Sequence, residues 1–125
     1  MQLVEHRAEG RLVVEAYGDG GFRVGGRRLT GGLLLFPHRF EPWPVSRLDE
    51  ATVADFAAVI DERPRVDLLL VGGGVRLAWP PASLRQALRH AGLAVEFMDT
   101  GAACRTYNLL VGEERRVAAA LIAVG

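Results

Sequence analysis

The first third of the chain alternates apolar and polar residues in the manner of β-strands. A strand is predicted over residues 11–17, where leucine, valine and tyrosine side chains surround one glutamate. Phe22-Arg23-Val24 repeats the alternation, and residues 27–29 are placed to pair back on it. Two glycine-rich turns separate these strands, at residues 18–21 and at Gly25-Gly26, because glycine tolerates the positive φ angles of tight hairpins. We therefore expect β-hairpins in this region.

A fully apolar segment follows the hairpins. Residues 33–36 read Leu-Leu-Leu-Phe, a run that is typical of a strand covered on both faces. Beyond it, Pro37, Pro42 and Pro44 exclude a regular central strand or a helix between residues 37 and 44, because proline has no N–H to donate. The N-terminal β region therefore ends at about residue 36.

From residue 49 the pattern alternates helices and strands. One helix is predicted from Asp49, its N-cap, to about residue 61; a second begins at Pro80-Pro81; a third is capped by Asp99-Thr100 and runs to about Leu110. The strands in this part are predicted over residues 66–71, 93–98 and 117–124. The apolar faces are Val53, Phe56, Ala57 and Ile60 on the first helix, and Leu84, Ala87, Leu88 and Ala91 on the second.

This order of elements predicts an α/β fold with a largely parallel sheet and right-handed crossovers. The 125 residues fit one domain, with a β-hairpin region at about 11–36 and an alternating β/α region at about 49–125. Ligands of such sheets usually bind beyond the carboxyl ends of the strands. Here those ends are Gly72–Gly74 and Asp99–Thr100, which we expect to face one cleft.

Composition limits the classes of partner. The chain carries 15 arginines, no lysine and 15 carboxylates, so its formal net charge is zero. A generic nucleic-acid binder and a polybasic membrane-surface protein both need a surplus of positive charge and are excluded. We attribute the missing lysine to compositional drift, although arginine is also the better bidentate donor to carboxylates and phosphates.

Residue chemistry indicates no metal or cofactor. Cys104 is the only cysteine, and the three histidines, His6, His38 and His90, show no metal-ligand spacing. The N-terminus lacks the apolar core of a signal peptide, and no apolar stretch is long enough to span a bilayer. We expect a cytoplasmic protein without membrane insertion, metal or cofactor, and the sequence shows no complete catalytic set.

Gly72-Gly73-Gly74 after an apolar strand invites comparison with a dinucleotide-binding loop. Gly72 and Gly74 match the first two positions of G-x-G-x-x-G, but the third position is Leu77. Residues 75–80 also separate the glycines from the next helix, so its N-terminus is not held against a pyrophosphate. A turn that permits close backbone approach and a loop for a small anion or ligand both stay open.

The third predicted helix carries further candidates. Asp99 is either a helix cap or a carboxylate that lines the cleft. Cys104 is either a small buried hydrophobe or a reactive thiol whose pKa is lowered near the helix N-terminus. Asn108 is a weak helix former, so its amide should have a specific partner.

Trp79, beside two prolines, is placed at the rim of the cleft, where it suits a partner surface.

The segment from about Val66 to the end resembles a known family. It reads strand, Val-Gly-Gly-Gly, Arg-Leu, Pro-Pro, helix, Gly-Leu-Ala-Val-Glu-Phe-Met-Asp-Thr, Ala-Cys-Arg-Thr-Tyr-Asn, strand. This is similar to the small proteins related to mitochondrial respiratory complex I assembly factor three, which include bacterial and archaeal homologues of unknown function. The matching motif positions are Gly72, Gly74, Pro80, Asp99, Thr100, Ala103, Tyr107 and Asn108.

The resemblance implies a compact three-layer α/β domain. Its mixed central sheet has about five strands, the last antiparallel to the others, with three helices and an N-terminal β-hairpin element. The family offers no established catalytic residues, and its mitochondrial members act through protein contacts. The expected role is therefore a non-enzymatic assembly or adaptor module with a protein partner.

The alternative is a small-molecule-binding protein or enzyme that uses the same cleft, and a homodimer also stays open. The candidate surface for either role comprises Gly72, Gly73, Gly74, Trp79, Pro80, Asp99, Thr100, Ala103, Cys104, Tyr107 and Asn108.

Overall fold

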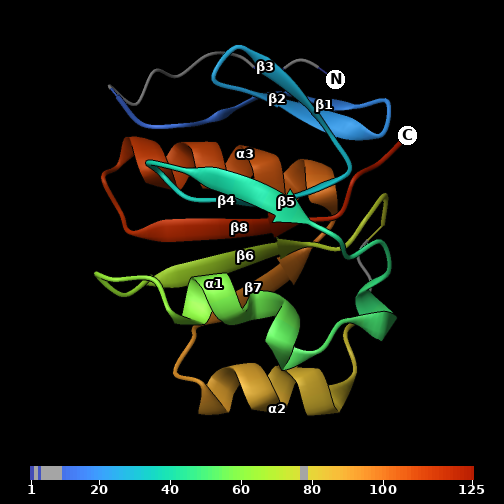
Figure 1. The fold of residues 1–125 in the computed structure, drawn as a ribbon, viewed down its shortest axis with the longest axis vertical. Coiled ribbons are helices and arrows are strands. Elements are labelled where there is room, and N and C mark those ends of the chain that lie inside the picture. Colours follow the sequence, from blue (N-terminus) through green and yellow to red (C-terminus); the bar gives the residue numbers. More distant parts are fainter. Residues whose placement is uncertain (2, 4–9, 77–78) are drawn as a thin grey trace.

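Five strands form a mixed central sheet in the order β5-β4-β8-β6-β7 (Figure 1). The computed structural model describes residues 1, 3, 10–76 and 79–125. The described residues do not include Leu77, the third position of the dinucleotide pattern. They also do not include most of the N-terminal segment, with His6, in which the sequence shows no signal-peptide core. The strands of the central sheet are β4 (Gly32–Leu35), β5 (Phe40–Trp43), β6 (Leu68–Gly72), β7 (Val95–Met98) and β8 (Val117–Leu121).

The strand directions confirm one expectation and correct another. Strands β6, β7 and β8 are parallel, as strand–helix alternation predicted. The last strand, however, is not antiparallel to the others: β8 runs parallel to β6 and antiparallel to β4. The reason is the helical crossover, since α3 (Thr100–Gly112) carries the chain back to the starting end of the sheet before β8 begins.

A separate antiparallel sheet is formed by β1 (Val14–Gly18), β2 (Gly21–Val24) and β3 (Arg27–Thr30). Two-residue turns join its strands, Asp19-Gly20 with φ of 52° and 78°, and Gly25-Gly26 with φ of 58° and 76°. Positive φ at both central residues is the type I′ geometry that matches the twist of a hairpin. The predicted hairpins are confirmed, and the glycine positions explain them.

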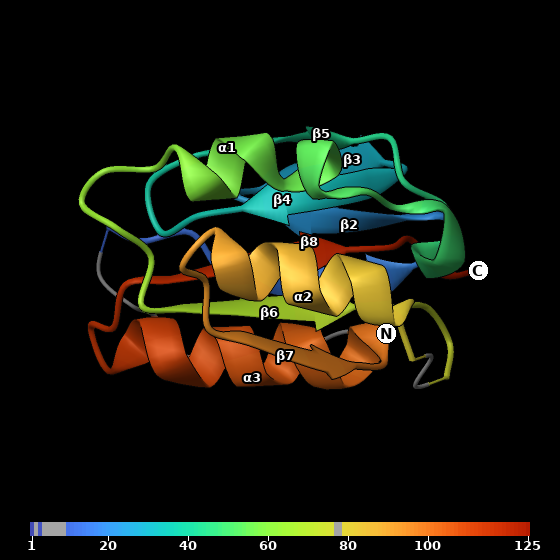
Figure 2. The ribbon, with the colours of Figure 1, turned by 90° about the horizontal axis from the view of Figure 1, so that it is seen from below.

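The inner strands of the central sheet are buried on both faces. In β4 the residues Leu33, Leu34 and Leu35 are at most 3% exposed. Successive side chains enter two different cores, because they alternate across a sheet. One core lies under α1 (Ala57–Ile60) and α2 (Ala82–His90), which Figure 2 shows in front of the sheet. The other core lies under α3 and the three-stranded sheet, and Figure 1 shows α3 between the two sheets. The helices α1 and α2, the central sheet and α3 form the three layers of the α/β domain, and the three-stranded sheet covers the outer side of α3.

The helix predicted over residues 49–61 is broken. The 3₁₀ turns η1 (Leu48–Glu50) and η2 (Val53–Phe56) precede the short helix α1. The cap is Thr52 rather than Asp49: its backbone N–H donates to the Asp55 carboxylate at 2.8 Å in a capping box. Of the predicted apolar face, Phe56 is buried and Ile60 half-buried, while Val53 and Ala57 are exposed and Val59 is buried in their place. The tighter 3₁₀ turn, with about three residues per turn, rotates the face.

The second and third helices match their predictions more closely. Pro81 is the N-cap of α2, and Gly92 ends that helix with a φ of 87°. Helix α3 begins after Asp99 and ends at Gly112. Strand β5 is an edge strand that contains Pro42, so the prolines do exclude a central strand there, but the N-terminal β region extends to Trp43, beyond its predicted end at about residue 36, because an edge strand tolerates proline.

Asn108 ties α3 to the three-stranded sheet. Its Nδ2 donates to the carbonyl of Val14 at 2.9 Å, and its Oδ1 accepts from the N–H of Val14 at 2.8 Å. The amide therefore pairs with the backbone of β1 as a neighbouring strand would. The specific partner expected for this mid-helix asparagine is confirmed.

We predict that Asn108→Ala lowers the free energy of unfolding by about 1–3 kcal/mol, because a part-buried N–H and C=O lose their partners. Denaturant titration measures the loss. The matched control is Leu109→Ala on the same helix, whose side chain is 61% exposed and whose loss should stay within about 0.5 kcal/mol. Equal stability of parent and Asn108→Ala would contradict a structural role for this amide.

Candidate functional site

The carboxyl ends of β6 and β7 meet, as the sequence predicted, but they are bonded to one another. The Gly73 N–H donates to the Met98 carbonyl at 2.9 Å, and the Thr100 N–H donates to the Gly74 carbonyl at 2.8 Å. A Cβ placed on Gly72 would lie 2.9 Å from the Cα of Thr100. The glycine is therefore needed for close backbone approach, and no space for a ligand separates Gly72 from Thr100.

Thr100 is the centre of this junction. Its side chain is fully buried, and its hydroxyl donates to the Ile122 carbonyl at 2.7 Å while accepting from the Gly74 N–H at 3.0 Å. The Ile122 N–H in turn donates to the Gly72 carbonyl at 2.9 Å. Both the donor and an acceptor site of the hydroxyl are thus occupied inside the fold, which suits a structural role and not that of a nucleophile.

Asp99 acts as the N-cap of α3. Its Oδ1 accepts from the Ala102 N–H at 2.8 Å, which satisfies one free donor of the first turn. The side chain is half-buried at the helix N-terminus, where a negative charge is favourable. The cap, one of the two interpretations of this residue, is the contact that the geometry provides.

Three further candidates on α3 belong to the core. Ala103, Cys104 and Tyr107 are fully buried against the central sheet. Burial raises the pKa of the Cys104 thiol to about 12, which is opposite to the lowering that a reactive thiol near a helix N-terminus requires. Burial also raises the pKa of Tyr107, whose hydroxyl donates to the Leu12 carbonyl at 3.2 Å. A partner cannot contact these side chains in the folded protein.

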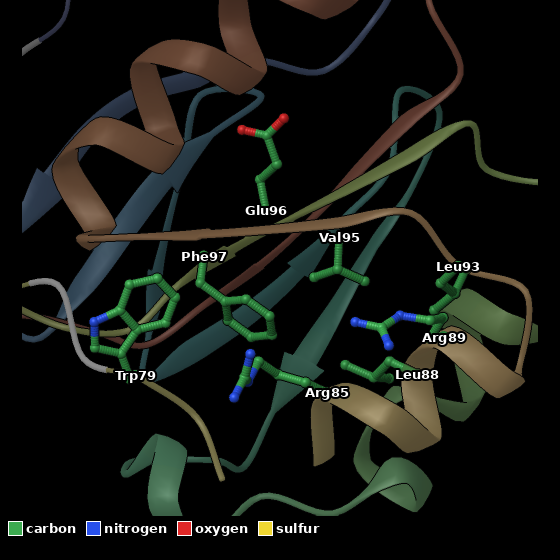
Figure 3. A pocket seen from close by; sticks show the side chains of 8 residues that line it. All are labelled: Trp79, Arg85, Leu88, Arg89, Leu93, Val95, Glu96 and Phe97. Atoms are coloured by element: carbon green, nitrogen blue, oxygen red, sulfur yellow. The ribbon is translucent and has the colours of Figure 1, made fainter. Parts of the chain in front are cut away.

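A groove at the outer edge of the sheet is the accessible feature of this region. It lies between β7 and α2 and has a volume of about 330 Å³ (Figure 3). The lining residues are Trp79, Arg85, Leu88, Arg89, Leu93, Val95, Glu96 and Phe97. Trp79 is 74% exposed, whereas the neighbouring Pro80 is buried at the start of α2. Trp79 is therefore the one predicted site residue that lines the groove.

None of the other lining residues is among the site residues predicted from the sequence. Val95 and Phe97 point from β7 toward α2, while Glu96 points to the other side of the strand (Figure 3). Arg85 and Arg89 lie one turn apart on α2, with apolar Leu88 between them. The signal that was available is charge: from Leu68 to Val95 the chain has three arginines and no carboxylate.

A second hollow lies at the opposite end of the sheet and is occupied by internal ion pairs. It has a volume of about 200 Å³ and includes Glu62, whose carboxylate contacts Arg39 at 2.9 Å and His38 at 3.2 Å. The Glu62 carboxylate is thus already held by an arginine and a histidine side chain. This hollow is the weaker candidate for a binding site.

Neither a metal-ligand cluster nor a membrane-spanning helix is found in the described part of the chain. Within residues 10–76 and 79–125, no three histidine, cysteine, aspartate or glutamate side chains are grouped to hold a metal ion. No helix in the same part of the chain combines the length and apolar character needed to cross a membrane.

Comparisons with known proteins agree with the architecture. Residues 14–122 match a family model described as "Protein of unknown function (DUF498/DUF598)". A human protein named NADH dehydrogenase [ubiquinone] 1 alpha subcomplex assembly factor 3 is 34% identical over 122 residues, which is 98% of this chain and 66% of that protein. This chain therefore spans just under two thirds of the length of that relative.

Bacterial proteins are similar over more of their length. An uncharacterised protein of Rhodobacter capsulatus is 39% identical over 113 residues, which is 90% of this chain and 86% of that protein. The solution structure of a Mth938-like domain from Bordetella pertussis superimposes with a TM-score of 0.76 at 32% identity, covering 98% of this chain and 92% of that one. The similarity thus extends over the whole fold.

We predict that Thr100→Val lowers the free energy of unfolding by about 1–3 kcal/mol, because the Gly74 N–H and the Ile122 carbonyl lose a buried partner. Thr100→Ser keeps the hydroxyl and is the matched control. Thermal and denaturant unfolding of the three proteins provide the measurement. A valine variant as stable as the serine variant would show that these two hydrogen bonds do not hold the junction together.

We also predict that Cys104 resists alkylation. With a pKa of about 12, roughly 10⁻⁴ of the thiol is ionised at pH 8, against about a quarter of an ordinary thiol. Iodoacetamide followed by mass spectrometry should label the folded protein far more slowly than the protein in guanidinium chloride. The control is Ser83→Cys in a Cys104→Ala background, because Ser83 is exposed. Similar rates for Cys104 and that exposed thiol would disprove the assignment.

The same pKa shift predicts an alkaline loss of stability. The pKa of Cys104 in the folded protein lies above the unfolded value of about 8.5. The buried neutral thiol therefore makes its full contribution to the free energy of unfolding below about pH 8.5. This contribution is lost as the pH rises toward about 12, and Cys104→Ala should lose less stability over that interval.

Proposed function

We propose that this chain, which belongs to the protein family of unknown function described as DUF498/DUF598, is a non-catalytic assembly factor. It holds a protein partner in the groove between β7 and α2. The observation that carries the proposal is the contrast between two parts of the same region. The groove presents a tryptophan that is 74% exposed, whereas the Thr100 hydroxyl and the Cys104 thiol, the potential nucleophiles of this region, are fully buried.

The assembly role is supported by homology. The human relative is named as an assembly factor of NADH dehydrogenase, and the aligned part covers 98% of this chain. We propose that the part shared with that relative is the partner-binding domain. Assembly of the respiratory NADH dehydrogenase is the specific role that we propose for this chain, and we place the protein in the cytoplasm.

The arrangement of the site explains how such a protein would work without catalysis. An assembly factor must present a preformed surface, because ordering flexible residues on binding costs affinity. The groove is built on a strand and a helix that are anchored by Leu88 and Leu93, which are at most 8% exposed. An exposed aromatic side chain on such a rigid frame is the usual composition of a protein-binding hot spot.

Deletion and complementation in the organism that encodes the chain test this proposal. We predict that deletion lowers NADH oxidation by isolated membranes and leaves succinate oxidation unchanged. The parent gene should restore NADH oxidation, and Trp79→Ala should restore it only in part, because the exposed indole of the groove is lost.

The matched control is Leu109→Ala, which removes another exposed apolar side chain, 61% exposed, from the unrelated helix α3. It should complement as the parent does. Unchanged NADH oxidation after deletion would overturn the proposed role in NADH dehydrogenase assembly, and full complementation by Trp79→Ala would overturn the assignment of the groove. Equal amounts of soluble variant in the cells establish that folding is not the cause.

A further inference from the structure

The open edge of the central sheet indicates how a partner binds. The backbone of β7 bonds to β6 through alternate residues, with the Ala94 and Met98 carbonyls accepting from the Leu69 and Gly73 N–H groups at 2.9 Å. Since backbone groups of successive residues point to opposite sides of a strand, those of Val95 and Phe97 face outward. In the part of the chain that the structure describes, no strand pairs with this side of β7.

The two edges of the sheet differ. The other edge strand, β5, contains Pro42, a residue that discourages pairing with a further strand. Strand β7 reads Val-Glu-Phe-Met and has no proline, and its pairing with β6 is regular through Met98. An unprotected edge of this kind is a template for an added strand.

The groove lies beside this edge. Val95 and Phe97 face α2, as does the groove (Figure 3), so a strand added along β7 would direct every second side chain over it. Part of the surface that would receive those side chains is apolar: Leu88 and Leu93 belong to the core beneath, and Phe97 is half-buried. The occupant should therefore carry apolar residues among the side chains that face the groove.

The charge of the groove adds a second requirement. Within residues 10–76 and 79–125, neither Arg85 nor Arg89 lies within ion-pair distance of a carboxylate, whereas arginines elsewhere, such as Arg39 and Arg116, do. The stretch from Leu68 to Val95 contains no carboxylate, and Glu96, the one carboxylate among the lining residues, points to the other side of β7 (Figure 3). In a chain of zero net charge, this local excess of positive charge favours an acidic occupant.

A second copy of the chain fits this edge poorly. Antiparallel pairing of β7 with itself about a two-fold axis would place both α2 helices on the same face of the joined sheet. The two Arg85 and Arg89 pairs would then face one another across the junction, and like charges in such contacts are unfavourable.

We propose that a partner protein binds by adding an extended segment to the outer edge of β7, and that its groove-facing side chains, which are every second one, include both apolar residues and carboxylates that contact Arg85 and Arg89. This inference rests on the proposed function and specifies the chemistry of the partner. The backbone of the segment supplies hydrogen bonds to Val95 and Phe97, and its side chains supply the specificity.

Peptide binding to the full chain, followed by NMR, tests the proposal. The probe is a blocked eight-residue peptide in which the side chains of one face are phenylalanine and glutamate in turn, and those of the other face are threonine. Two control peptides carry lysine for each glutamate, or N-methyl groups on the alternate backbone nitrogens that would pair with β7. We expect the acidic peptide to shift the amide signals of Val95 and Phe97 and to slow their hydrogen exchange at least tenfold, because these N–H groups become paired.

Both control peptides should bind at least tenfold more weakly than the acidic peptide. The double substitution of Arg85→Gln and Arg89→Gln should weaken the acidic peptide about tenfold and remove most of its salt dependence. The control pair Arg47→Gln and Arg63→Gln, exposed arginines away from the groove, should leave binding unchanged.

Three results would overturn the proposal. One is the absence of shifts at Val95 and Phe97 at millimolar acidic peptide, and another is equal binding of the lysine or N-methylated peptide. The third is a dimer of the chain, measured by analytical ultracentrifugation, in which the same two amides are protected without peptide.

Failure of the inference can be told apart from failure of the proposed function. If Trp79→Ala complements poorly but the Arg85 and Arg89 substitutions complement fully and no amide is protected, the groove binds a partner in another way. If deletion leaves NADH oxidation unchanged while the acidic peptide binds as described, the assembly role fails and the strand-addition site stands.

Discussion

The last strand, β8, is the constraint on which the rest of the structure depends. It pairs antiparallel with β4 and parallel with β6, and so joins the N-terminal β region to the β/α region in one sheet. Its five residues are at most 1% exposed. Three of them are alanines, whose small side chains let layers approach from both faces. Without this strand the two halves of the chain would not share a sheet.

The same strand explains why the predicted cleft is closed. Just beyond β8, the carbonyl of Ile122 accepts the Thr100 hydroxyl and its N–H bonds to Gly72. The carboxyl ends of three parallel strands are therefore bonded into one junction. In other α/β sheets this is where ligands bind. Here the hydrogen-bonding groups are used for stability, so an accessible surface remains at the outer edge of the sheet instead.

The net charge of zero does not mean that charge is evenly distributed over the protein. Fifteen arginines balance fifteen carboxylates, and the zero sum argues against broad electrostatic partners. Several arginines make their pairs within the fold, including Arg39 with Glu62 and Arg116 with Asp67. Arg85 and Arg89 project from a helix without carboxylates. A protein that is neutral overall can thus present a locally positive groove, and its specificity then depends on shape as well as charge.

The sequence by itself determined the local features: the type I′ turns, the two-sided burial of residues 33–36, the ends of α2 and α3, and the need of Asn108 for a partner. These follow from backbone preferences and from side-chain periodicity within a few residues. The motif near the third helix also indicated the family. Only the tertiary structure decided the antiparallel pairing of β8 with β4, the break before α1, the raised pKa of Cys104 and the groove beside β7. Each of these depends on which distant segments pack together, because strand pairing, desolvation and surface shape are set by neighbours in space and not by neighbours in the chain.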